Sequence, residues 1–172
     1  RALEPAVRWT STVVHISEIP AGWPVGYGSA WRAPWRADGK PTRIALIPVG
    51  YADGYPRTLG GKPGGGPGWV GFTARPWERK AGGEEEGTAG SGQVGTSGGT
   101  VFAPVVGRVS MDQITVDVTD VPEAYLQCVG ALDGGPEVEL IGRVRGAPNF
   151  ISTLAAAGGS ITHELLTRIG PR

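Results

Sequence analysis

Residues that could do chemistry gather where predicted strands begin or end. The segment 108–113 holds both charge signs and the only methionine of the chain, and it directly precedes residues 114–118. In 114–118 apolar and polar side chains alternate with the period of a half-buried strand. Polar groups at a strand end suit a site held by a rigid β scaffold. Met111 also has a purely structural alternative, because methionine readily fills gaps in a core.

A second group of such residues follows an apolar strand pattern over 43–50. The turn after it carries Tyr51, Asp53 and Arg57, and Tyr27 lies further upstream between two glycines. Flanking glycines let the backbone adopt conformations closed to other residues and let a ligand approach closely. An unperturbed phenol loses its proton only at about pH 10, so acid/base work by a tyrosine needs a cation or hydrogen bond nearby. The tyrosines could instead pack locally, and the arginine could be merely solvated.

The elements that would position these residues are mainly short strands. Thirty glycines and fifteen prolines indicate many turns. Apolar patterns predict strands over 13–16, 43–50, 114–118 and 137–142, with Pro48 at the edge or end of its strand.

Two short helices are expected near the C-terminus. The first covers 152–157 and is stopped by Gly158 and Gly159. The second would begin at Ser160 as its N-cap and would place His163 in its first turn. Four-residue spacing predicts one buried stripe on this helix, formed by Ile161, Leu165 and Ile169.

The segment from about 58 to 102 differs in composition from the rest of the chain. It is rich in glycine and contains Glu84–Glu86 and a polar tract over 88–100. Such a composition buries too little apolar surface to offset its ordering entropy, so we predict a flexible insertion. The acidic run indicates solvation rather than a metal site. Part of the insertion could be anchored against the domain by Trp69, Val70, Phe72 and Trp77.

Length and charge narrow the class of protein. The 172 residues fit one domain. The 16 basic residues balance 16 acidic ones, so the net charge indicates neither a nucleic acid nor an acidic membrane as a binding partner. No apolar run is long enough to cross a bilayer, and no secretory leader opens the sequence. Cys128 has no internal partner and indicates a buried or incidental thiol in a reducing cytoplasm. His15 and His163 lack further ligands at suitable spacing, so no metal site is expected.

Four motifs, in this order, resemble the C-terminal β domain of alanine racemase. They are VGYG at 25–28, VGYADGYPR at 49–57, GRVSMDQ at 107–113 and LTRIGPR at 166–172. The resemblance implies an all-β fold, a small Greek-key-like barrel with short C-terminal helices and a long glycine-rich insertion. Alanine racemases carry a pyridoxal phosphate-binding TIM barrel ahead of this domain, and no segment here alternates strands and helices as that barrel must. Since the chain also opens on Arg1, we expect half of a longer protein.

The resemblance implies roles for particular residues. Tyr27 would be the second acid/base catalyst, opposite the cofactor-binding lysine, and would reach into the partner subunit's active site. The backbone N–H of Met111 would bind the substrate carboxylate, and Asp112 would fix that turn. His163 stands where relatives usually have a tyrosine bound to the cofactor phosphate, to which an imidazole N–H can also donate. The entryway to the site would be lined by Tyr51, Arg57, Arg108 and Ile161.

The implied whole protein is a pyridoxal phosphate-dependent isomerase that converts L-alanine to D-alanine for peptidoglycan precursors. It would be a cytoplasmic twofold homodimer without nucleic-acid or membrane partners. Pyridoxal phosphate would act as the electron sink and would be bound by the barrel domain, not covalently by this chain. This chain alone would be inactive.

Two other classes stay open. One is a related racemase for serine or for several amino acids, because this half of the protein does not define the side-chain pocket. The other is a non-catalytic β-barrel binding module, for example for single-stranded nucleic acid. That alternative comes from the interleaved aromatic and basic residues Trp31, Arg32, Trp35 and Arg36. The neutral charge and the following Asp38–Gly39 turn favour a surface hairpin with aromatics at its rim.

Overall fold

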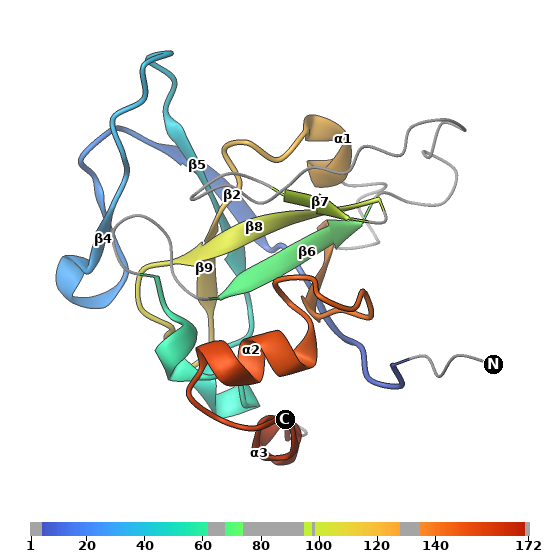
Figure 1. The fold of residues 1–172 in the computed structure, drawn as a ribbon. Coiled ribbons are helices and arrows are strands. Elements are labelled where there is room, and N and C mark those ends of the chain that lie inside the picture. Colours follow the sequence, from blue (N-terminus) through green and yellow to red (C-terminus); the bar gives the residue numbers. More distant parts are fainter. Residues whose placement is uncertain (1–4, 62–67, 74–94, 98, 128–134, 171–172) are drawn as a thin grey trace.

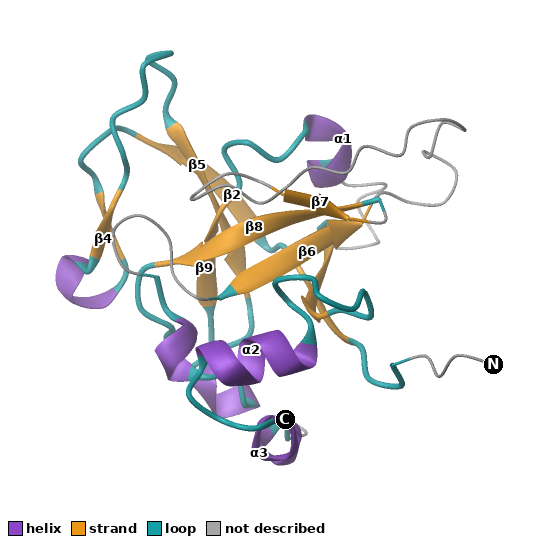
Figure 2. Ribbon diagram, in the orientation of Figure 1, coloured by secondary structure: helices purple, strands orange, loops and turns teal. Residues whose placement is uncertain are grey.

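The computed structural model describes residues 5–61, 68–73, 95–97, 99–127 and 135–170. Short strands dominate it, and the helices are few and short, as Figure 2 shows. The strands are β1 Trp9–Thr12, β2 His15–Ile19, β3 Pro24–Val25, β4 Trp31–Arg32, β5 Thr42–Ile47, β6 Trp69–Thr73, β7 Gly95–Ser97, β8 Thr100–Val106, β9 Ile114–Asp117 and β10 Glu137–Ile141. The α-helices are α1 Glu123–Leu126, α2 Ile151–Ala157 and α3 Thr162–Arg168, and the 3₁₀ helices are η1 Tyr27–Ser29, η2 Tyr51–Asp53 and η3 Arg57–Leu59.

One antiparallel sheet forms the body of the domain (Figure 1). Among the described residues its strand order is β1-β10-β6-β8-β9-β5-β2, and β7 also pairs with β8. The two end strands, β1 and β2, are consecutive in the chain. Val13 donates its N–H to Pro136 O beside β10, and Val14 donates to Leu46 O of β5, both at 2.9 Å. The sheet therefore curls until its two ends meet at this two-residue link, which confirms the prediction of an all-β, barrel-like domain with short C-terminal helices.

The central strand β8 is buried along all seven residues. Val101, Ala103 and Val105 join the main core, while Val106 joins a smaller cluster. Pro104 lies where β8 changes its partner from β6 to β9, so its missing N–H falls at a break in the ladder. A strand covered on both faces reads as a continuous apolar run, as this one does.

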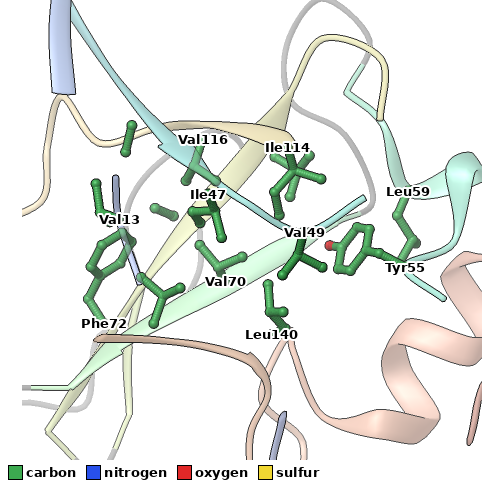
Figure 3. Packing of buried hydrophobic residues seen from close by; sticks show 14 of the residues in the cluster. Val13, Ile47, Val49, Tyr55, Leu59, Val70, Phe72, Ile114, Val116 and Leu140 are labelled. Carbon is green, nitrogen blue, oxygen red and sulfur yellow. The ribbon is translucent and has the colours of Figure 1, made fainter. Parts of the chain in front are cut away.

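The main core fills the inside of the curled sheet (Figure 3). Val70 and Phe72 of β6, Ile47 of β5 and Leu140 of β10 all point into this core, and all four side chains are fully buried. Burying one such side chain contributes about 1.5–3 kcal/mol. β6 is therefore a principal strand of the core.

The segment 58–102 is therefore not irregular throughout. Its start contains η3 and β6, and its end contains β7 and the first residues of β8, so these parts belong to the domain's regular structure. Val70 and Phe72 anchor the segment as expected, and Trp69 is half-buried. Residues 74–94 lie outside the described residues, and with them the expectations for Trp77 and Glu84–Glu86. Cys128 lies outside them too.

Most of the other expected elements are present. The strands at 114–117 and 137–141 and the helix at 151–157 confirm their sequence patterns, and β5 ends at Ile47, directly before Pro48. The expected strand at 13–16 is instead divided, because Val13 and Val14 link two strands that pair at opposite ends of the sheet.

Candidate functional site

A small apolar cluster packs the turn that carries Tyr27 against the sheet. β3 and β4 pair with Val25 opposite Trp31, and both side chains are buried against Ile44 and Val106. Gly26 and Gly28 take positive φ values of 72° and 69°, so the chain can turn tightly between the two strands. Tyr27 is left at the tip with 71 % of its surface exposed. The alternative of a locally packed tyrosine is therefore wrong.

Arg108 lies directly against this turn. A Cβ added at Gly28 would lie 3.7 Å from Cζ of Arg108, and one added at Gly26 would lie 3.1 Å from its backbone nitrogen. The approach of the two loops is tight at Gly26, whereas the distance at Gly28 is an ordinary contact. Within the described part of the chain the Arg108 guanidinium makes no ion pair or hydrogen bond. An exposed cation that has no carboxylate partner among the described residues therefore lies beside the Tyr27 turn.

A second pair of loops meets at Gly50 and Met111. Tyr51 donates its N–H to Ser110 O, and Ala52 donates to Met111 O, both at 3.0 Å. A Cβ at Gly50 would lie only 2.3 Å from Met111 O, so only glycine fits there. The Met111 side chain is 50 % exposed, which makes the core-filling alternative wrong.

The peptide between Ser110 and Met111 has a defined direction. In a planar trans peptide the C=O and N–H bonds point to opposite sides. Because Ser110 O faces the Tyr51 N–H, the Met111 N–H points away from the 50–53 turn. No hydrogen bond from this N–H is made within the residues that the structure describes. The loop therefore presents a backbone donor that is free to meet an external acceptor.

Tyr51 and Arg57 interact on the outside of the same turn. Cζ of Arg57 lies 6.0 Å from the centroid of the Tyr51 ring, which is a cation–π contact. Tyr51 is 45 % exposed, and Arg57 is exposed as well. The tyrosine therefore does not merely cap the core, and the arginine is more than a solvated charge.

Helix α3 contacts this turn through its last residues. A Cβ at Gly54 would lie 2.3 Å from Arg168 O and 2.8 Å from Cα of Ile169. Leu165 is buried in the main core, and Ile169 packs against it. Ile161 and His163 lie at the other end of the helix, and both are exposed.

Two expectations for α3 were wrong. The N-cap residue is Ile161, not Ser160, and the Ser160 hydroxyl contacts the Glu164 carboxylate instead. Ile161 has an extended backbone before the first turn and is 65 % exposed, so of the three residues only Leu165 is buried, and Ile169 is partly buried at the C-cap. His163 is in the first turn as expected.

The expected site residues thus share one property, exposure. Seven large hydrophobic side chains are exposed in the described ranges, and four of them are Tyr27, Tyr51, Met111 and Ile161. Contacts bring the 26–28, 50–57 and 107–111 loops together, and α3 joins them at Gly54. Sequence analysis did not identify the contacts through which Gly50 and Gly54 hold this surface, since both link segments far apart in the chain.

Two of the four residues that suggested nucleic-acid binding are not available for it. Trp31 is 4 % exposed and belongs to the small core cluster, so it is not a rim aromatic. The Arg36 guanidinium is paired with Asp38 at 3.2 Å and Asp120 at 2.9 Å. These carboxylates raise the pKa of Arg36 and offset its charge. Only Trp35 and Arg32 stay exposed, which does not make a stacking platform along a basic groove.

Metal-binding clusters and membrane-spanning helices are absent from the described residues. There, no group of three or more histidine, cysteine or acidic side chains is arranged to hold a metal ion. No helix in these ranges has both the length and the apolar character needed to cross a membrane.

Comparison with known proteins identifies the family. The family model described as "Alanine racemase, C-terminal domain" matches residues 6–71 and 81–172. The chain is 35 % identical over 170 residues to the alanine racemase of Acidiphilium cryptum, and 35 % identical over 170 residues to a catabolic alanine racemase of Rhizobium johnstonii. These alignments cover 99 % of this chain but only 34 % and 33 % of the relatives.

Solved structures agree. The crystal structure of the biosynthetic alanine racemase from Pseudomonas aeruginosa matches with a TM-score of 0.63 and 30 % identity, over 99 % of this chain and 34 % of that one. The alanine racemase from Bartonella henselae, solved with covalently bound pyridoxal phosphate, matches with a TM-score of 0.60 and 27 % identity, over 95 % of this chain and 33 % of that one. The chain spans about a third of the length of these proteins. It belongs to the alanine racemase C-terminal domain family.

Proposed function

We propose that this chain is the C-terminal domain of a pyridoxal phosphate-dependent alanine racemase and that it completes the active site of a partner subunit. The whole enzyme would be a cytoplasmic homodimer that interconverts L-alanine and D-alanine for peptidoglycan precursors. Family membership and the chain's span of about a third of its relatives support this proposal. On this view the domain alone does not racemise alanine, because its cofactor-binding barrel lies elsewhere.

The observation that carries the proposal is the exposed phenol of Tyr27. Racemisation needs one acid/base group on each face of the substrate Cα, so that a proton leaves one side and returns to the other. Tyr27 stands 71 % exposed on a turn flanked by buried Val25 and Trp31, with the guanidinium of Arg108 against the adjoining Gly28. A group placed in this way can enter a second subunit's site, and a twofold axis would then create two equivalent shared sites.

The free N–H of Met111 is proposed to bind the substrate carboxylate. A backbone donor suits this task, since the fold fixes its direction and it carries no titratable charge. The peptide geometry supports the role, because Ser110 O is occupied by Tyr51 and the Met111 N–H points the other way.

The entryway is proposed to consist of Tyr51, Arg57, Arg108 and Ile161. All four side chains are exposed. Among the described residues neither Arg57 nor Arg108 is paired with a carboxylate. Unpaired cations at the mouth of a site raise the local concentration of an anionic substrate.

Pyridoxal phosphate would supply the electron sink that stabilises the deprotonated Cα. The described residues suit a supporting role toward it. Lys40 is the only lysine among them, and it lies in the loop before β5, away from the Tyr27 and Met111 loops in sequence. His163 is proposed to donate an imidazole N–H to the cofactor phosphate in place of the family's tyrosine. Its exposure in the first turn of α3 leaves the ring accessible.

The proposal is tested with the full-length protein and the substitution Tyr27→Phe. A positioned acid/base contributes about 10²–10⁴-fold, so racemisation should fall by that factor. Solvent deuterium exchange at Cα should be lost for one enantiomer of alanine and kept for the other, since only one face loses its proton carrier. Tyr125→Phe is the matched control, because Tyr125 is half-buried in α1 and packs against the main core. Normal racemisation by the Tyr27 variant would contradict the proposal, and a panel of enantiopure amino acids would distinguish alanine from serine or broad specificity.

A further inference from the structure

We infer that the carboxylate of Asp53 is a positioning residue that sets the direction of the Met111 N–H. The inference rests on the proposed function only for the meaning of that N–H as the substrate-carboxylate donor. The contacts that lead from Asp53 to Met111 are all made within this chain.

Asp53 closes the 50–55 turn from both sides. Its Oδ2 accepts the N–H of Gly50 at 2.8 Å, and its own N–H donates to Gly50 O at 3.1 Å. Tyr55 donates to the same carbonyl at 3.1 Å, and Gly54 donates to Tyr51 O at 3.2 Å. The side chain thus acts like the acidic member of a capping box, which reaches back to the N–H that begins a helical turn.

The turn needs such a fixing contact because its first residue must be glycine. A Cβ at Gly50 would lie 2.3 Å from Met111 O and 2.4 Å from Ser110 O, so no side chain fits. Glycine, however, has the largest conformational freedom of any residue. The bond from its N–H to the Asp53 carboxylate removes much of that freedom, and an ionised acceptor makes it stronger than a bond between neutral groups.

The fixed turn then holds the opposite loop. The N–H groups of Tyr51 and Ala52 are aimed at Ser110 O and Met111 O, at 3.0 Å each. Since a peptide is planar, fixing Ser110 O also fixes the plane that contains the Met111 N–H. Ser110 donates in turn to Gln113 O at 3.1 Å, which closes the loop on its far side. The direction of the donor therefore depends on Asp53 although Asp53 does not touch a substrate.

The test compares Asp53→Ala and Asp53→Asn in the full-length protein. Asp53→Ala should raise KM for alanine about tenfold with a smaller change in kcat, because one charge-assisted hydrogen bond is lost. Asp53→Asn keeps an oxygen acceptor for the Gly50 N–H and should raise KM only about twofold to threefold. The matched control is Asp38→Ala, which removes an exposed carboxylate bound to Arg36 in the loop between β4 and β5.

Amide hydrogen exchange provides a readout independent of racemisation. Peptides covering 50–57 should exchange faster in Asp53→Ala than in the wild type, since the Tyr51 and Ala52 N–H groups lose their fixed partners. Peptides from β6 and β10 should be unchanged, and Asp38→Ala should leave 50–57 as in the wild type. If the wild type does not racemise alanine, the proposed function fails, while exchange still decides the role of Asp53. Wild-type exchange over 50–57 in Asp53→Ala would overturn the inference, and so would a loss of protection throughout the sheet in both Asp53 variants.

Discussion

Replacing Gly50 by alanine tests whether the approach of two loops positions the site. The backbone at Gly50 is extended, with φ −138° and ψ −162°, so alanine meets no torsional obstacle there. Its Cβ would nevertheless lie 2.3 Å from Met111 O and 2.4 Å from Ser110 O, whereas ordinary contacts begin at 3.4 Å. Both obstacles are backbone atoms, so they cannot rotate away. The loop must therefore move by about 1 Å, the contact distance minus the available one.

Two effects follow from that displacement. Two backbone hydrogen bonds at 3.0 Å are strained or lost, each contributing about 0.5–1.5 kcal/mol, and overpacking adds about 1–3 kcal/mol. The free energy of unfolding should therefore fall by about 2–6 kcal/mol. A displacement of about 1 Å in a positioning group can also lower turnover about 100-fold, so kcat/KM for L-alanine should fall by about that factor in the folded variant.

The assay measures alanine racemisation and urea-induced unfolding on the full-length protein. Gly170→Ala is the control, because a Cβ there would meet no atom within 4 Å and its φ is not positive. Activity must be compared under conditions in which both variants are fully folded. If Gly50→Ala keeps wild-type stability and kcat/KM, the tight packing of Gly50 on Met111 does not exist in solution. The geometry proposed for the Met111 N–H would then be wrong.

Two further predictions concern His163 and Asp117. His163→Ala should weaken retention of pyridoxal phosphate by the full-length protein about tenfold, as measured by dialysis and absorbance, whereas His15→Ala on β2 should not; equal retention would remove His163 from the cofactor site. Burial raises the pKa of the Asp117 carboxyl, although hydrogen bonds from Thr119 oppose this. A raised pKa in the folded state means that stability is complete below the pKa of an unfolded aspartate and falls as the pH rises through the folded value. Asp117→Asn should therefore leave Tm unchanged at acid pH and raise it increasingly toward neutral pH; a constant difference would contradict this reasoning.

Local patterns predicted the parts of the fold that depend on local physics. The alternation of Ile114 and Val116 with polar neighbours gave a strand whose burial alternates in the same way. Pro48 lacks an N–H for the ladder, and β5 stops immediately before it. Gly158 and Gly159 end α2, the second with a positive φ of 71°. In each case the deciding interaction lies within a few residues of the chain.

Other features depended on contacts between distant segments. The apolar run Val13–Ile16 looks like one strand, yet Val13 and Val14 bond to different ends of the sheet, and only the curled fold shows this. Trp69–Thr73 lies in a glycine-rich segment whose average composition hid a short core strand. Trp31 was expected at the rim of a surface hairpin because of the neutral charge and the following Asp38–Gly39 turn, but it is buried in a small core cluster with Val106.

The candidate site shows the same contrast between what local sequence patterns predict and what depends on contacts between distant segments. The family resemblance predicted Tyr27, Tyr51, Met111 and Ile161 as site residues, and their roles stay predictions. The reason why they stay exposed could not be obtained from the sequence. For Tyr51 and Met111 it involves Gly50, where the two backbones approach so closely that no side chain fits between them.

Exposure of this kind has a cost for an isolated domain. A large apolar side chain left in water forgoes about 1.5–3 kcal/mol of burial, and an exposed arginine without a carboxylate gains no ion pair. The domain nevertheless holds Tyr27, Met111 and the cations Arg57 and Arg108 outward on loops tied by backbone hydrogen bonds and tight glycine contacts. Ordering these groups in advance lowers the entropy lost when a partner surface and an anionic substrate reach them. These properties are those expected of the proposed shared site, in which the loops would present groups that are already ordered.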